Sequence, residues 1–156
     1  MRSSEIESLY AQYGPVVLRR ARALLGETEA AQDVLHEIFI RLLRSPELLS
    51  GVASRVAYFY QATTHACLNR LRHETLRKKH LAVVKPPPER VGHTPAVDDR
   101  IHLQRLLASA PEELQQIAVY YYVDQMSQDE IAELVGVSRR TIGHRLDAFR
   151  QLAEES

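Results

Sequence analysis

The stretch from Tyr58 to Arg72 gathers side chains that suit single-stranded nucleic acid. It combines aromatic rings, amides, hydroxyls and arginines. Aromatic rings can stack on unpaired bases, and guanidinium groups can hold the phosphate backbone. One helix with these groups could therefore hold a separated DNA strand. Phe59 and Tyr60 also fall on an apolar helical stripe, so a packing role for these two rings is an open alternative.

The segment Gln128–Arg145 has the residue spacing of a helix-turn-helix. A small Ala132 lets two helix backbones approach, Gly136 permits a left-handed turn, and Ile142 fills the space between the helices. Ser138 can cap the second helix, whose first side chains would then face bases in the major groove. A helical hairpin packed for structure alone is the alternative, because such motif matches include false positives.

The charge of the chain is unevenly distributed although its net value is zero. Residues 55–80 hold six basic side chains and one acidic one, whereas residues 111–156 hold four basic and nine acidic ones. A basic tract in a neutral chain indicates one specific anionic partner. Phosphate neutralisation supplies most non-specific DNA affinity, so the acidic C-terminal part should bind DNA weakly by itself.

No residue pattern supports an enzyme, a metal site or a cofactor site. The one cysteine, Cys67, excludes an internal disulfide and a cysteine-based zinc site. His65, His73 and His80 drift around one helix without a set of carboxylates. No Gly-rich phosphate loop, paired-carboxylate cleft signature or nucleophile elbow is found. We therefore expect neither catalysis nor a bound metal or cofactor.

The length and the apolar pattern bound the class of protein. A chain of 156 residues suits one domain or two small ones. It has no apolar run of about 18 residues, which a membrane span would need. The first residues show no apolar core of an export signal. A cytoplasmic protein without a membrane partner is the expectation.

Helical periodicity dominates the elements that must position these side chains. Pro15 suits the first turn of a helix, which predicts a break between an opening helix and a second helix ending at Gly26. Further helices are expected over about 28–44 and 54–79, and four more after residue 100. No strand is predicted.

The periodicity stops in residues 84–99, which hold four of the seven prolines. Pro86–Pro88 favour extended polyproline II, a semi-rigid spacer. The sequence therefore predicts an all-α fold. Two small helical domains, residues 1–80 and residues 101–156 with the helix-turn-helix, would be joined by a proline-rich linker over residues 81–100.

Four motifs in chain order resemble the extracytoplasmic-function (ECF) group of the bacterial sigma-70 family. In that family an opening helix, a polymerase-binding helix, a helix that melts and reads the −10 promoter element, and a −35-reading domain follow one another. The similar segments here are Leu9–Pro15, Asp33–Leu42, Tyr58–Arg72 and Leu114–Leu146. The order of four motifs is more specific than any single one.

The resemblance implies a specificity subunit without catalytic residues, which binds core RNA polymerase, directs it to promoter DNA and helps to melt the −10 element. Many members of that family are bound by an anti-sigma factor, so the resemblance also implies such a partner. The positions that match the polymerase-binding helix are Asp33, His36, Glu37, Phe39, Ile40 and Arg41.

The resemblance also implies two sets of DNA contacts. One set belongs to the helix that reads the −10 element, and the other to the helix that enters the −35 major groove. The matching −10 positions are Tyr58, Gln61, Thr64, His65, Asn69, Arg70 and Arg72. The matching −35 positions are Ser138, Arg139, Arg140, Thr141, His144 and Arg145.

Two other functions stay open from the residues. An autonomous DNA-binding regulator would use only the helix-turn-helix and would leave residues 33–42 and 58–72 without a role. A sigma-like protein-interaction module would bind partners without starting transcription, and the acidic residues 111–156 keep that option open.

Overall fold

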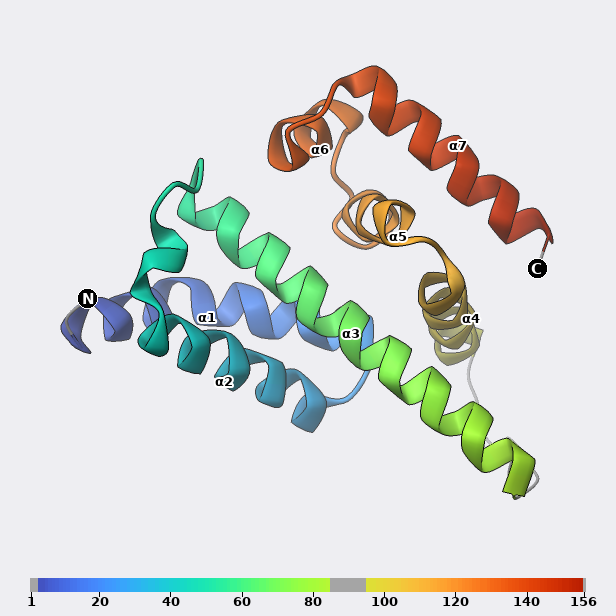
Figure 1. Cartoon of the computed structure of the whole chain (residues 1–156), viewed down its shortest axis with the longest axis horizontal. Coiled ribbons are helices and arrows are strands. Elements are labelled where there is room, and N and C mark those ends of the chain that lie inside the picture. The colour runs from blue at the N-terminus through green and yellow to red at the C-terminus, as the bar shows by residue number, and fades with distance from the viewer. Residues whose placement is uncertain (1–2, 85–94, 156) are drawn as a thin grey trace. The chain divides into compact units, whose positions relative to one another are not determined.

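The computed structural model describes residues 3–84 and 95–155, and every regular element in these ranges is helical (Figure 1). The expected all-α fold is confirmed, and no strand occurs in the described ranges. The elements are α1 (Ser3–Leu25), α2 (Thr28–Arg44), η1 (Pro46–Leu49), α3 (Arg55–Val84), α4 (Pro95–Ser109), α5 (Glu112–Ala118), η2 (Val119–Val123), α6 (Gln128–Val135) and α7 (Arg139–Glu155).

The chain divides into two compact units, Met1–Cys67 and Leu68–Ser156, so the division falls inside α3. Helix also reaches into both ends of the expected linker, because α3 extends to Val84 and α4 begins at Pro95. Extending a formed helix costs little, and proline is well tolerated in a first helical turn. The expected polyproline segment at residues 86–88 lies outside the described residues, and the domain limits at residues 80 and 100 stay a prediction.

The core of the first unit lies between α1, α2 and one face of α3. Three rings form its centre: Tyr13 stacks on Phe59 at 4.7 Å between centroids, and Phe59 stacks on Phe39 at 5.4 Å. Phe59 is fully buried, so this ring has the packing role that the sequence left open as an alternative. The other fully enclosed apolar side chains are Val17, Ala21, Ala31, Val34, Leu42 and Cys67.

The break predicted at Pro15 is wrong, because α1 runs through this residue as one helix. A proline inside a helix removes one hydrogen bond and costs about 3 kcal/mol. Buried apolar residues lie on both sides of it, with Ile6 and Leu9 before and Val17 and Leu24 after. Burying one such side chain stabilises by about 1.5–3 kcal/mol, so packing of the two halves on one core outweighs the proline.

The second unit holds α7 against α5 and α6. Ile131 of α6 and Ile142, Leu146 and Phe149 of α7 are buried. Between α5 and α6 the chain makes the π-helical turn η2, in which the amide of Asp124 donates to the carbonyl of Val119 at 3.1 Å. This wide turn is the part of the second unit that an α-helical periodicity does not predict.

Candidate functional site

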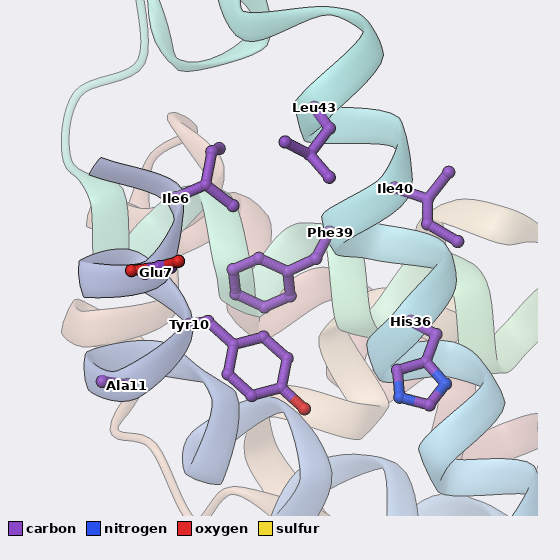
Figure 2. A pocket seen from close by; sticks show the side chains of 8 residues that line it. All are labelled: Ile6, Glu7, Tyr10, Ala11, His36, Phe39, Ile40 and Leu43. Atoms are coloured by element: carbon purple, nitrogen blue, oxygen red, sulfur yellow. The ribbon is translucent and has the colours of Figure 1, made fainter. Parts of the chain in front are cut away.

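A groove of about 400 Å³ lies between the start of α1 and the exposed side of α2. Figure 2 shows rings and aliphatic side chains of both helices facing it. Tyr10, Ile40 and Leu43 are 42%, 47% and 55% exposed, so they present an apolar surface to solvent. Its complete lining is Ile6, Glu7, Tyr10, Ala11, His36, Phe39, Ile40 and Leu43.

The residues expected to bind polymerase lie on and beside this groove. Phe39 is buried, and its ring meets the Tyr10 ring edge-on at 5.0 Å between centroids, so it supports the groove from below. Glu37 and Arg41 are one helical turn apart, with 3.9 Å between a carboxylate oxygen and a guanidinium nitrogen. The expected positions that are exposed are Asp33, His36, Glu37, Ile40 and Arg41.

Five residues of the groove lining were not among the expected polymerase contacts. They are Ile6, Glu7, Tyr10 and Ala11 of α1 and Leu43 of α2. Helical periodicity assigns a face to each residue but does not show where two packed helices leave a gap. The groove forms only where α1 and α2 pack together, so neither helix alone predicts it.

Five of the seven residues expected at the −10 element share one face of α3. Their spacing is three, four, four and three residues, which keeps side chains on one side of a helix with 3.6 residues per turn. We call this face the α3 stripe. It consists of Tyr58, Gln61, His65, Asn69 and Arg72.

The remaining two expected −10 residues lie off the α3 stripe. Thr64 is fully buried, and its hydroxyl accepts a hydrogen bond from Arg20 at 2.9 Å. Its side chain therefore offers no surface to DNA in this structure. Arg70 is half-buried and falls on another side of the helix. We keep only the stripe residues as candidate DNA contacts of α3.

Tyr58 stands where the α3 stripe comes close to α2. Partial burial raises the pKa of its hydroxyl above the usual value, and the positive charge of Arg41 acts in the opposite direction. The phenol is therefore neutral near pH 7 and remains able to stack or to donate a hydrogen bond. Its ring packs edge-on against Phe59 at 5.2 Å, which ties the stripe to the core.

The helix-turn-helix geometry predicted for α6 and α7 is present. Ser127 and Glu130 form a reciprocal capping box at the start of α6. Gly136 ends α6 with φ 83°, the left-handed conformation that favours glycine. The hydroxyl of Ser138 accepts from the amide of Thr141 at 3.1 Å, which caps α7, and Ile142 is fully buried beneath.

The arginines of α7 already contact other side chains of the second unit. Arg139 lies 3.7 Å from the carboxylate of Asp129 on α6. Arg140 donates to the imidazole of His144 at 3.4 Å. Arg150 donates to the hydroxyl of Tyr122, and this bond raises the pKa of the guanidinium further.

The expected −35 residues are mainly at the surface of α7. Thr141 and Arg145 are half-buried. The exposed ones are Ser138, Arg139, Arg140 and His144. They gather at the first turns of α7, the end of the helix that a helix-turn-helix presents to base edges.

Two family models match the chain. Sigma-70 region 2 matches residues 9–77, and sigma-70 region 4 matches residues 100–147. Over 155 residues the chain is also 28% identical to a protein named ECF RNA polymerase sigma factor SigE from Mycolicibacterium smegmatis, an alignment that covers 93% of this chain. The chain spans 58% of that relative's length. The chain belongs to the sigma-70 family, because the two matched regions together cover most of it.

The two matched regions divide the candidate surfaces between them. Region 2 contains α2, the α3 stripe and most of the groove, although Ile6 and Glu7 precede its first matched residue. Region 4 contains the helix-turn-helix as far as Asp147. Within residues 3–84 and 95–155, no helix is long and apolar enough to cross a bilayer. In the same ranges, no three metal-ligating side chains come together.

Proposed function

We propose that this chain is an ECF-type RNA polymerase sigma factor, which binds core RNA polymerase, directs it to specific promoters and helps to melt the −10 element. The observation that carries the proposal is the presence of sigma-70 regions 2 and 4 in one chain and in this order. In this proposal the chain contributes binding surfaces in the cytoplasm and no catalytic group, because the polymerase performs the chemistry.

Region 2 would act through two faces. The groove and the exposed side of α2 would bind the polymerase, because an exposed apolar surface rimmed by charged groups suits a protein partner. The α3 stripe would hold the separated −10 strand, with Tyr58 for stacking and Arg72 for the backbone. An anti-sigma factor that covers the same groove is the further partner that we propose.

Region 4 would place the first turns of α7 in the −35 major groove. Ser138 and Arg139 lie where phosphates and base edges are reached in a helix-turn-helix. Three arginines of α7 have neighbours of their own, so this contact would be modest alone and would depend on the polymerase to bring it to DNA.

Transcription in vitro tests the proposal. The protein is mixed with core polymerase and a library of promoter DNA, and the transcripts are sequenced. Start sites that share two upstream elements, absent when the protein is omitted, are the expected result. Binding to duplex DNA without polymerase would instead indicate an autonomous regulator. Polymerase binding without new transcripts would indicate an interaction module.

A further inference from the structure

Arg20 of α1 is an unusual part of the region 2 core. It is 2% exposed, and among the residues whose burial is described it is the one charged side chain that is buried. Placing a guanidinium in a core is costly unless hydrogen bonds compensate for the lost water. Its neighbours on α1, Arg19 and Arg22, are exposed. The burial of Arg20 therefore needs an explanation that does not apply to Arg19 and Arg22.

The guanidinium of Arg20 contacts one face of α3 at three points. It donates to the backbone carbonyl of Tyr60 at 2.7 Å and to the hydroxyl of Thr64 at 2.9 Å. Its central carbon also lies 4.3 Å from the centroid of the Tyr60 ring, a cation–π distance. Residues 60 and 64 are one helical turn apart, so all three contacts grip the same side of α3.

The α3 stripe lies on a different side of the same helix. Each residue turns an α-helix by about 100°, so the centre of the stripe is roughly 120° around the axis from the face that Arg20 holds. The rotation of α3 that satisfies Arg20 is therefore also the rotation that turns His65 and Asn69, two exposed stripe residues, to solvent.

Apolar packing alone defines this rotation less sharply. The buried face of α3 is broad, and apolar contact has no preferred direction. Hydrogen bonds weaken steeply when their angles depart from the preferred range, and a planar guanidinium fixes two of them at once. The residues buried on α3 are Phe59, Thr63, Thr64, Cys67, Leu68 and Leu71.

We propose that Arg20 is a positioning residue for promoter opening: by holding Tyr60 and Thr64, it sets the rotation of α3 and so presents the α3 stripe to the −10 strand. The inference rests on the proposed function of region 2. It adds a residue that does not touch DNA and that lies on α1, a different helix from the one that carries the predicted −10 contacts.

The test compares Arg20→Met and Arg20→Lys with the matched control Arg19→Met, which changes an exposed arginine of the same helix. Two quantities are measured for each full-length protein: affinity for core polymerase, and promoter opening by the fluorescence of 2-aminopurine in the −10 element. Lysine keeps the charge but loses the planar fork, so it also separates charge from geometry.

We expect promoter opening to fall about tenfold in Arg20→Met, as for the loss of hydrogen bonds to a charged group, with polymerase affinity unchanged within about twofold. Arg20→Lys should retain part of the promoter opening, and Arg19→Met should retain all of it. If Arg20→Met does not fold, Arg20→Lys carries the comparison.

Thr64→Ala provides an independent check of the same contact. It should reduce opening less than Arg20→Met, and it should add nothing when Arg20 is already replaced, because the two residues act as one unit. Additive effects of the two substitutions would contradict the inference.

The outcomes separate the inference from the proposed function. If the unchanged protein opens no promoter, the proposed function fails and the inference fails with it. If the unchanged protein opens promoters and Arg20→Met opens them equally well, only the inference fails. A parallel loss of polymerase affinity and opening would assign Arg20 a merely structural role and would also overturn it.

Discussion

The two helices that we assign to promoter DNA arrange their candidate contacts differently. On α3, the candidate contacts form one stripe on a side that the Arg20 grip does not use. On α7, the arginines at residues 139, 140 and 150 already bind neighbouring side chains. DNA binding by α7 therefore exchanges existing contacts for new ones. On the α3 stripe Arg72 also has a partner, because its guanidinium donates to the amide oxygen of the buried Gln115 at 2.7 Å.

The existing partners of the α7 arginines should weaken the contact of region 4 with DNA. Exposed ion pairs are worth about 0–1 kcal/mol, and the Arg139–Asp129 pair is highly exposed on both sides. Phosphates can displace such a partner, but the carboxylate stays nearby and repels them. We therefore expect the DNA contact of region 4 to be weak by itself.

The largest effect is expected from a charge in the region 2 groove. Ile40→Asp places a carboxylate in a surface that the polymerase would desolvate, which should weaken polymerase binding by about 3 kcal/mol or more. Ile40 is 47% exposed, so the fold should persist. Leu76→Asp is the matched control, because Leu76 is 64% exposed and does not line the groove. Equal affinities of both variants for core polymerase would contradict the docking surface.

A smaller effect is expected on α7. Arg140→Ala should weaken use of promoters by about 1–3 kcal/mol and relax base preference at one −35 position, if Arg140 leaves His144 to contact a base edge. Promoter-library transcription measures both quantities. Arg105→Ala serves as the control, because Arg105 is exposed on α4, outside the helix-turn-helix. An unchanged −35 preference would count against the base contact.

The next prediction runs in the opposite direction and sharpens the contrast. Asp129→Asn removes the carboxylate beside Arg139, so promoter affinity of the polymerase complex should rise by about 0.3–1 kcal/mol at low salt. Glu133→Gln removes one charge from the same helix at an exposed position outside this pair. Equal gains for the two variants would show a general charge effect and would reject the role of the pair.

The smallest effect concerns the acid stability of region 4. Hydrogen bonds from the backbone and then the side chain of Ser127 lower the pKa of Glu130 below its usual value of 4.5. A lowered pKa adds stability that is complete above the unfolded value and is lost as the pH falls through the folded value. Thermal unfolding between pH 7 and pH 3 should therefore lose less stability in Glu130→Gln than in the unchanged protein. Identical acid profiles of the two proteins would show that the capping box does not contribute to the acid response.

The sequence predicted the helix-turn-helix because its signals are local. A glycine in the left-handed region and a serine cap each act within four residues, so Gly136 and Ser138 could be placed without tertiary structure. The all-α fold followed for the same reason, since helical periodicity is read along one segment.

Thr64 shows where local reasoning ended. Apolar periodicity treats an arginine such as Arg20 as a surface residue, so it cannot predict that the guanidinium enters the core and draws Thr64 inward. The groove was hidden for a related reason, because its lining combines Tyr10 and Leu43 from two helices. Both features depend on how α1 packs against its neighbours, which no single segment encodes.

The wide turn at Val119–Val123 gives region 4 an intolerance to changes in chain length. A π-helical turn contains one residue more than an α-helical turn, and each residue rotates the following chain by about 100°. Deleting a single residue there would remove the extra residue of the wide turn, so the hydrogen bond from the Asp124 amide to the Val119 carbonyl would be lost and the chain would need a new path to α6. A substitution that keeps the chain length leaves this spacing intact.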